Sequence, residues 1–159
     1  MRPTFYLEDD YEKENPIRAG GVLFYKYDST SQQYNLLMIN TNGKYEDFGG
    51  QTDLEDDDLV DTVSRETEEE SNGIFSKAFI KNKIKDTEPI YIKNCKYMLY
   101  IVEIDKYYDP KDFGDKEIYE DIDRTIEWVS FDDFTHKRLN FRLTDKNVTN
   151  CLNKLCSGK

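Results

Sequence analysis

Apolar residues recur along the chain in short runs that alternate with polar turns. Residues 18–26 (RAGGVLFYK) and 34–40 (YNLLMIN) are each predicted to form a strand, because apolar runs of this length bounded by polar turns are typical of strands. The segment DSTSQQ joins them, and Asn42–Gly43 after the second run indicates another turn. Further strands are predicted over residues 74–80, 89–104 and 124–130, and the second of these ranges is long enough for a hairpin.

Two segments follow the period of a helix instead. From Asp58 onward, apolar and small side chains recur near every 3.6 residues, at Leu59, Val60, Val63 and Thr67. Asp57 or Asp58 is suited to cap the start of this helix, and Asn72–Gly73 is suited to end it. A second helix is predicted near the C-terminus from Val148, Cys151, Leu152 and Leu155, which makes Cys151 a core residue.

Mixed strands and helices without repeats or a linker predict one α/β layered domain over residues 16–159, preceded by a polar arm over residues 1–15. Three cysteines without CxxC spacing and a single histidine argue against a zinc site or a disulfide framework. Any metal must therefore be bound by oxygen ligands. The N-terminus lacks a signal-peptide pattern and no apolar run is long enough for a membrane span, so we expect a cytoplasmic protein that does not contact a membrane.

Charge is distributed unevenly along the chain. The formal net charge is −11, yet from His136 onward six basic residues face one acidic residue, which leaves −16 on the preceding part. Binding to nucleic acid through charge alone is excluded, because neutralising phosphates needs clustered Lys and Arg. A phosphorylated substrate must be met by a local basic patch, by metal ions, or by both.

The negative charge is densest in residues 49–73, which contain ten carboxylates and one basic residue, Arg65. On the predicted helix, Glu66, Glu69 and Glu70 are spaced i, i+3, i+4 and project from one face, where like charges repel. An all-carboxylate cluster matches Mg²⁺ or Mn²⁺. A solvated acidic helix face is the alternative explanation of the same run.

These residues resemble the Nudix hydrolase signature, which is Gly, five residues, Glu, seven residues, then R-E-U-x-E-E-x-G-U, where U is a bulky aliphatic residue. The positions that match are Gly50, Arg65, Glu66, Glu69 and Glu70. The chain departs from the signature by one extra residue between Gly50 and Arg65, by Asp57 or Asp56 at the first acidic position, by Thr67, and by Asn72–Gly73 in place of Gly-U. The aromatic approach KYEDFGG and the later IEWVSFDDF fit as well. The resemblance implies a Nudix-type α/β/α sandwich with a mixed β-sheet.

The same resemblance implies a metal-dependent pyrophosphohydrolase. Glu66, Glu69, Glu70 and the Gly50 carbonyl would hold Mg²⁺ or Mn²⁺, and Arg65 would pin one carboxylate in place. One carboxylate must orient or deprotonate the attacking water. In some relatives it lies on the helix and in others on a loop before the last strand. That loop offers Glu117, Glu120, Asp121 and Asp123 here, of which we favour Glu120.

Three residues are candidate substrate contacts. Arg18 stands at the start of the first strand, where relatives that bind diphosphates place a basic residue. Lys44 and Tyr45 precede Gly49–Gly50 and would meet a phosphate and a base, respectively. A surface charge or a half-buried aromatic ring explains each of them equally well.

The function implied is hydrolysis of phosphoanhydride bonds in nucleoside diphosphate-linked or polyphosphate substrates. Candidates are ADP-ribose, dinucleoside polyphosphates, diphosphoinositol polyphosphates and the mRNA cap. The expected partner is a small phosphorylated molecule, with RNA possible only as a capped substrate, and a homodimer is possible because many relatives dimerise. The alternative is a catalytically silent Nudix-fold module that binds or senses a nucleotide.

Overall fold

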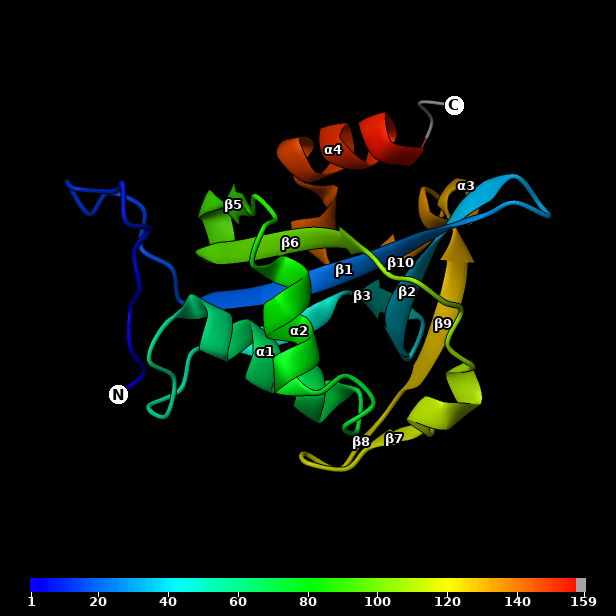
Figure 1. Ribbon diagram of the computed structural model, residues 1–159, viewed down its shortest axis with the longest axis horizontal. Helices are drawn as coiled ribbons and strands as arrows, with labels where there is room; N and C mark the ends of the chain where they lie inside the picture. The colour runs from blue at the N-terminus through cyan, green and yellow to red at the C-terminus, as the bar shows by residue number, and fades with distance from the viewer. Residues whose placement is uncertain (157–159) are drawn as a thin grey trace.

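A mixed β-sheet forms the middle layer of the protein (Figure 1). The computed structural model describes residues 1–156. The strand order is β10-β3-β2-β1-β6-β5, with β4 paired to β1 and β9 paired to β2. Strand β1 runs parallel to β6, and β3 runs parallel to β10, whereas the other pairs of this sheet are antiparallel. Its strands are β1 (Ala19–Asp28), β2 (Gln33–Thr41), β3 (Lys44–Glu46), β4 (Phe48–Gln51), β5 (Ile90–Ile92), β6 (Tyr97–Glu103), β9 (Thr125–Ser130) and β10 (Arg138–Leu139).

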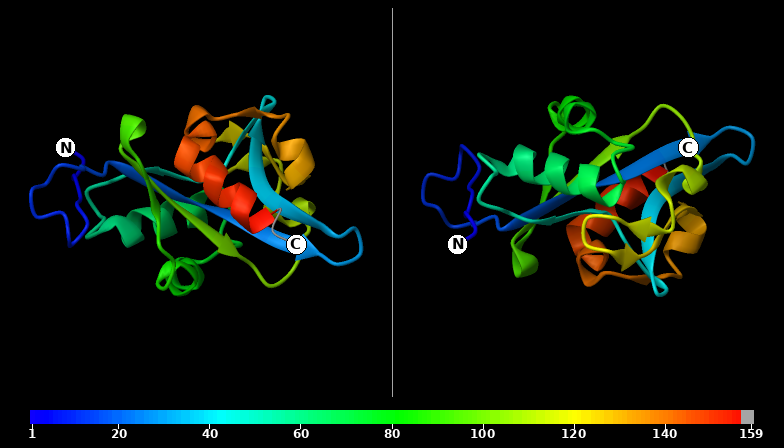
Figure 2. Two further views of the ribbon diagram at one scale, coloured as in Figure 1. Left: turned by 90° about the horizontal axis from the view of Figure 1, so that it is seen from above. Right: turned by 90° about the horizontal axis from the view of Figure 1, so that it is seen from below.

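Helices cover both faces of the sheet (Figures 1 and 2). Helices α1 (Leu59–Glu70) and α2 (Lys77–Ile84) lie on one face, and α4 (Lys146–Cys156) lies on the other. Successive side chains of β1 alternate between the two cores, because Phe24 packs with Val63 of α1, whereas Leu23 packs with Leu152 of α4. The expected α/β/α sandwich is therefore confirmed. The remaining helical turns are α3 (Phe131–Phe134) and the 3-10 turns Lys93–Cys95, Pro110–Phe113 and Phe141–Thr144.

Most of the predicted elements are present. Strands β1, β2 and β9 lie where the apolar runs predicted them, and residues 89–104 form an antiparallel hairpin of β5 and β6. The predicted acidic helix is α1, with Asp58 as its N-cap, and the predicted C-terminal helix is α4. The first residues run along the body of the protein, where Phe5 bridges Ile17, while the boundary of the arm at residue 15 stays a prediction.

The strand predicted over residues 74–80 is wrong. Ser76 instead caps a helix, because its hydroxyl accepts a hydrogen bond from the backbone N–H of Phe79 at 3.1 Å. Ile80 and Ile84 then lie four residues apart on the buried face of α2. The apolar run is too short for its period to distinguish a strand from a helix, and the capping serine was the available signal.

The polar segment between β6 and β9 contains regular secondary structure, which its composition did not predict. It contains the turn Pro110–Phe113 and a small hairpin of β7 (Lys116–Glu117) and β8 (Ile122–Asp123). Phe113 is fully buried against Phe75 and Tyr108, which anchors the segment.

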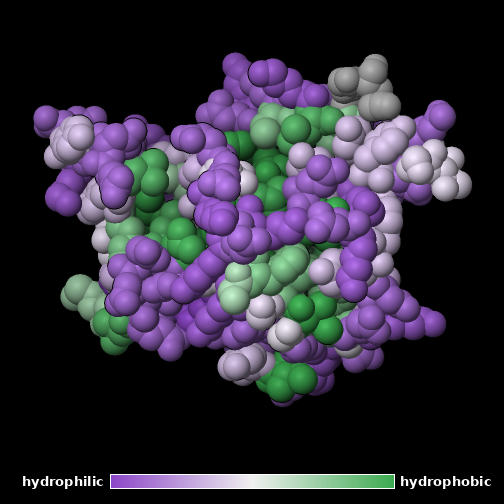
Figure 3. Space-filling view, in the orientation of Figure 1, coloured by the Kyte–Doolittle hydropathy of each residue, from purple (hydrophilic) through white to green (hydrophobic). Residues whose placement is uncertain are grey.

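The surface is largely polar on the face shown in Figure 3, with apolar side chains gathered in smaller patches. Within residues 1–156 no helix combines the length and the apolar character that crossing a membrane requires.

Candidate active site

The α1 helix carries the predicted carboxylates near its C-terminal end, while its apolar side is anchored in the core. Leu59 and Val63 are buried against the sheet, so the orientation of the helix is fixed. Glu66, Glu69 and Glu70 lie toward its C-terminal end. The side chains of Glu66 and Glu69 are only 15% and 20% exposed. The solvated acidic face that was the alternative explanation would leave these groups in water, and they are not.

Burial makes negative charge costly at these three positions. Desolvation raises the pKa of Glu66 to about 7, and the neighbouring Glu69 adds to this, although Arg65 opposes it. Burial likewise raises the pKa of Glu69 and raises that of Glu70 well above its usual value. Glu66 contributes to the shift of Glu70 as well. The cluster is thus short of positive charge, which a bound cation would supply.

The Gly49–Gly50 pair brings the backbone against this cluster. Both glycines lie in β4, opposite Gly21 and Gly20 of β1. A Cβ on Gly50 would lie 2.4 Å from the carboxyl carbon of Glu66, so any side chain at this position would displace the Glu66 carboxylate. The N–H of Gly49 donates to Glu70 Oε1 at 2.7 Å.

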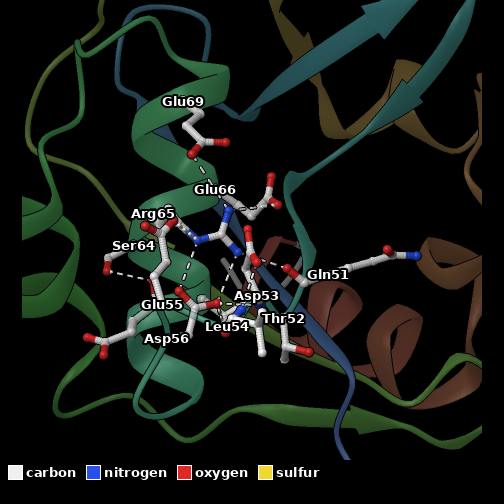
Figure 4. Close-up of polar contacts among 12 residues, drawn as sticks. Gln51, Thr52, Asp53, Leu54, Glu55, Asp56, Ser64, Arg65, Glu66 and Glu69 are labelled. Atoms are coloured by element: carbon white, nitrogen blue, oxygen red, sulfur yellow. Dashed lines mark hydrogen bonds and ion pairs between the residues drawn. The ribbon is translucent and has the colours of Figure 1, made fainter. Parts of the chain in front are cut away.

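Arg65 organises the other side of the cluster (Figure 4). Its guanidinium makes a bidentate pair with Asp56, with Nε–Oδ1 at 2.9 Å and Nη2–Oδ2 at 3.0 Å, and Nη2 also donates to the carbonyl of Gln51. Nη1 faces the helix carboxylates, at 3.2 Å from Glu66 and 3.6 Å from Glu69. The hydrogen bonds with Asp56 raise the pKa of Arg65, so it stays charged.

The carboxylates of Glu66, Glu69 and Glu70 are oxygen ligands of the kind that a hard divalent cation such as Mg²⁺ or Mn²⁺ prefers, but they do not converge on one point. Across residues 1–156, no three acidic, histidine or cysteine side chains converge as a ready-made metal site. The reason is visible in the contacts: Glu66 and Glu69 turn toward Arg65, and Glu70 turns toward Gly49. Carboxylates with raised pKa values next to a glycine backbone are oxygen ligands that a cation would draw together.

Two loop acids face the helix cluster. Glu117, at the end of β7, is 6% exposed and accepts a hydrogen bond from the N–H of Glu120 at 2.6 Å. Glu117 raises the pKa of Glu69, and Glu120 raises the pKa of Glu66, which places both within electrostatic reach of the helix. A small cavity of about 60 Å³ lies between Glu70, Glu117 and the strand residue Glu46. Glu120, which we favoured, is exposed, so Glu117 is the more enclosed of the two.

Of the predicted substrate contacts, Lys44 and Tyr45 lie on β3, one strand before the glycine pair. Tyr45 is buried, and its hydroxyl donates to Glu127 Oε1 at 2.8 Å. Lys44 lies next to Arg138 across the β3–β10 pair, and the ammonium of Lys137 lies 5.0 Å from the centre of the Tyr45 ring. A basic strip formed by Lys44, Lys137 and Arg138 therefore borders β3.

Arg18 is held by the N-terminal arm. Its Nη1 donates to the carbonyl of Arg2 at 2.8 Å and to the hydroxyl of Thr4 at 2.7 Å. The arm also reaches the end of β4, where Arg2 donates to the side chain of Gln51. Arg18 thus supports the arm, and binding a diphosphate would require it to exchange these partners.

A buried polar network lies beneath the glycine pair. Asp47 accepts hydrogen bonds from the Tyr97 hydroxyl and from Arg142 Nε, the latter at 2.8 Å, and it forms an ion pair with Arg142 Nη2 at 2.7 Å. A Cβ on Gly49 would lie 2.1 Å from the Tyr97 hydroxyl. The position of β4 is therefore fixed from below by residues that no sequence motif had singled out.

Comparison with solved structures identifies this architecture as the Nudix fold. The structure resembles the NUDIX domain of Shewanella oneidensis NrtR complexed with ADP ribose, with a TM-score of 0.57 and 15% identity over 94% of this chain and 99% of that chain. It also resembles a C. elegans Ap4A hydrolase in a binary complex, with a TM-score of 0.50 and 15% identity over 87% and 94% of the two chains. No protein-family model matches the sequence, and no curated protein is significantly similar to it. The fold that the resemblance implied is confirmed.

The geometry also locates the extra residue in the signature. Arg65 pairs with Asp56, which is separated from Gly50 by five residues as in the signature, while Asp57 is exposed. The extra residue therefore lies between Asp56 and Arg65. The sequence motif did not single out Asn72 or Arg124, whose side chains both bond to the backbone of the segment that carries Glu117. For Asn72, the available signal was its place at the glycine position of the signature.

Proposed function

We propose that the protein is a divalent-metal-dependent hydrolase of phosphoanhydride bonds in nucleoside diphosphate-linked or polyphosphate substrates. The observation that carries this proposal is the set of three partly buried carboxylates, Glu66, Glu69 and Glu70, beside the Gly50 backbone on a Nudix fold. Burial raises the pKa of each of these carboxylates, which means that their charged forms are unfavourable in the folded protein. Clusters of this kind are typical of catalytic and metal-binding sites.

Each residue has a role that follows from its contacts. Glu66, Glu69 and Glu70, with the Gly50 carbonyl, would hold Mg²⁺ or Mn²⁺, which offsets the charge of the diphosphate and makes water a better nucleophile. Arg65 keeps Glu66 and Glu69 oriented through its pair with Asp56.

A loop acid would take the proton of the attacking water. Both loop candidates stay open, Glu120 as the one favoured from the sequence and Glu117 as the one enclosed beside Glu70. A general base must lie within hydrogen-bond reach of the water, directly or through one further water. The enclosed position of Glu117 therefore favours it.

Two features support a nucleotide or polyphosphate substrate. The basic strip of Lys44, Lys137 and Arg138 along β3 would offer positive charge to those phosphates of a substrate that lie away from the metal. Two of the structural neighbours are an Ap4A hydrolase and a domain complexed with ADP ribose. We therefore place dinucleoside polyphosphates and ADP-ribose first among the candidates, ahead of diphosphoinositol polyphosphates and the mRNA cap.

The test is a panel of these four substrates with Mg²⁺ or Mn²⁺, assayed for release of phosphate or nucleotide. We expect metal-dependent turnover of at least one substrate by the wild type, and loss of that turnover in Glu70→Gln. The Glu68→Gln variant is a matched control, because Glu68 lies on the same helix but bonds to the N–H of Lys77, away from the cluster.

The competing function is a module that binds a nucleotide without cleaving it. The neighbour complexed with ADP ribose favours this alternative. Wild-type protein that binds ADP-ribose in calorimetry, yet releases no product from any substrate on the panel, would replace the hydrolase proposal with this one.

A further inference from the structure

The C-terminal end of α1 is closed by Asn72, which adopts a left-handed conformation with a φ of 53°. Its N–H bonds to the carbonyl of Glu69, and the N–H of Gly73 bonds to the carbonyl of Glu68 at 2.8 Å. This pair of bonds is a Schellman motif, which needs only the backbone of the left-handed residue. The side chain of Asn72 is thus not needed to end the helix.

That side chain instead bonds to a segment far along the chain. Asn72 Nδ2 donates to the carbonyls of Phe113 at 2.9 Å and Lys116 at 2.8 Å, and Oδ1 accepts from the N–H of Ile118 at 3.0 Å. Both amide hydrogens and the carbonyl oxygen are used, so the amide is matched to the backbone of residues 113–118. A glycine at this position would end the helix equally well and make none of these bonds.

Arg124 ties the same segment to the helix from a second side. The residue is 5% exposed, and its Nη2 donates to the carbonyls of Glu70 at 2.8 Å and Phe113 at 3.1 Å, while Nη1 donates to Gly114 at 2.8 Å. The Glu70 carbonyl belongs to the last turn of α1, whose carbonyls lack partners within the helix. A positive charge at this end of the helix is favourable as well.

Between these two anchors lies the β7–β8 hairpin that carries Glu117. The hairpin has two residues in each strand, and so small a hairpin is not stable by itself. Glu117 and Glu120 also lie within electrostatic reach of Glu69 and Glu66, and these like charges repel one another. An attachment is therefore needed to keep Glu117 beside Glu70.

We propose that Asn72 and Arg124 form a clamp that positions Glu117 against the carboxylates of α1. The inference rests on the proposed function and makes Asn72 and Arg124 positioning residues for the hydrolysis. Neither residue touches the reacting atoms. The departure of Asn72 from the glycine of the Nudix signature is then a functional feature of this chain.

The test compares Asn72→Gly with Asn72→Asp. Glycine keeps the left-handed backbone and removes the three side-chain bonds. Aspartate keeps the size and the acceptor for Ile118, but it places a carboxylate against two carbonyls. The control is Gln32→Gly, since Gln32 has a φ of 58° in the turn between β1 and β2, remote from the hairpin. The measurements are hydrogen exchange at the Ile118 amide, the melting temperature, and kcat and KM with Mg²⁺.

In Asn72→Gly we expect exchange at Ile118 to become at least about tenfold faster. We expect kcat to fall about tenfold to a hundredfold with KM and the melting temperature little changed, because misplaced catalytic groups slow the reaction without weakening ground-state binding. In Asn72→Asp we expect kcat to fall by at least as much, and in Gln32→Gly we expect the exchange rate at Ile118 and kcat to equal those of the wild type.

Unchanged exchange at Ile118, or an unchanged kcat in both Asn72 variants of an active enzyme, would overturn the clamp and leave the hydrolase proposal standing. A wild type that turns over no substrate would instead overturn the hydrolase proposal, and with it the positioning role.

Discussion

The backbone N–H of Gly49 donates to Glu70 Oε1 at 2.7 Å, and this bond joins the glycine loop to the acidic helix. It directs the Glu70 carboxylate toward the backbone that precedes Gly50 rather than toward solvent. The bond also needs glycine at position 49, because a Cβ there would lie 2.5 Å from the carbonyl oxygen of Gly20. Glu70 is thus the carboxylate most tightly coupled to the loop.

This coupling makes Glu70→Gln the sharpest test of metal binding. Glutamine retains an oxygen that accepts from Gly49, so we expect the fold to be preserved. The loss of one anionic ligand should cost several kcal/mol of catalysis, or at least about a hundredfold in kcat. Titration with Mn²⁺ in a calorimeter should show weaker binding to this variant than to Glu68→Gln. Equal affinity in the two variants would remove Glu70 from the metal site.

Stability without metal should depend on pH through Glu66. Its pKa in the folded protein is about 7, because burial raises it and Glu69 adds to the shift. The folded state therefore binds more protons than the unfolded state between the ordinary glutamate pKa and about 7, so stability falls as the pH rises through this window. The free energy of unfolding should therefore be about 2–3 kcal/mol lower at pH 8 than at pH 5.

Urea unfolding between pH 5 and pH 8 in the presence of a chelator measures this effect. Glu66→Gln should reduce the decline without abolishing it, because burial raises the pKa of Glu69 and Glu70 as well. Mg²⁺ should offset the decline in the wild type by stabilising the charged form. The exposed Glu12, changed to Gln, should leave the decline as it is. A wild-type stability that rises from pH 5 to pH 8 would contradict the raised pKa of Glu66.

The pairing of Arg65 with Asp56 predicts different effects for two adjacent residues. Asp56→Asn removes the carboxylate that holds a buried guanidinium, and we expect a loss of about 3 kcal/mol in the free energy of unfolding. Activity should fall too, because Arg65 would no longer orient Glu66 and Glu69. Asp57→Asn changes an exposed neighbour and should be nearly neutral. Chemical denaturation of both variants decides whether Asp56 is the partner.

The basic strip beside β3 predicts an effect on substrate affinity. Lys44→Ala should raise KM about tenfold with little change in kcat, because a lysine far from the metal would bind the ground state and the transition state alike. Lys85→Ala, at an exposed position after α2, is the matched control. A change in kcat with an unchanged KM would place Lys44 at the reacting phosphate instead.

Local sequence determined the elements that have a clear period and clear end signals. Helix α1 begins at Leu59, directly after its N-cap Asp58, and ends before Asn72–Gly73, as capping and left-handed preferences predict. The Glu66, Glu69 and Glu70 face follows from helical spacing alone. Residues 74–80 were misread because the few apolar side chains there fit either period, and Ser76 determined the outcome as a cap.

Tertiary structure decided what lies around that face. Nothing local reveals that Arg142 bonds to Asp47, 95 residues away, or that Arg124 bonds to the carbonyl of Glu70. The signature left Asp57 or Asp56 for its first acidic position, and only the path of the loop made Asp56 the partner of Arg65. Glu117 and Glu120 are equally acidic in the sequence, and packing alone buries Glu117. The physical reason is that burial and long-range hydrogen bonds depend on where distant segments meet, which the local pattern of a sequence does not contain.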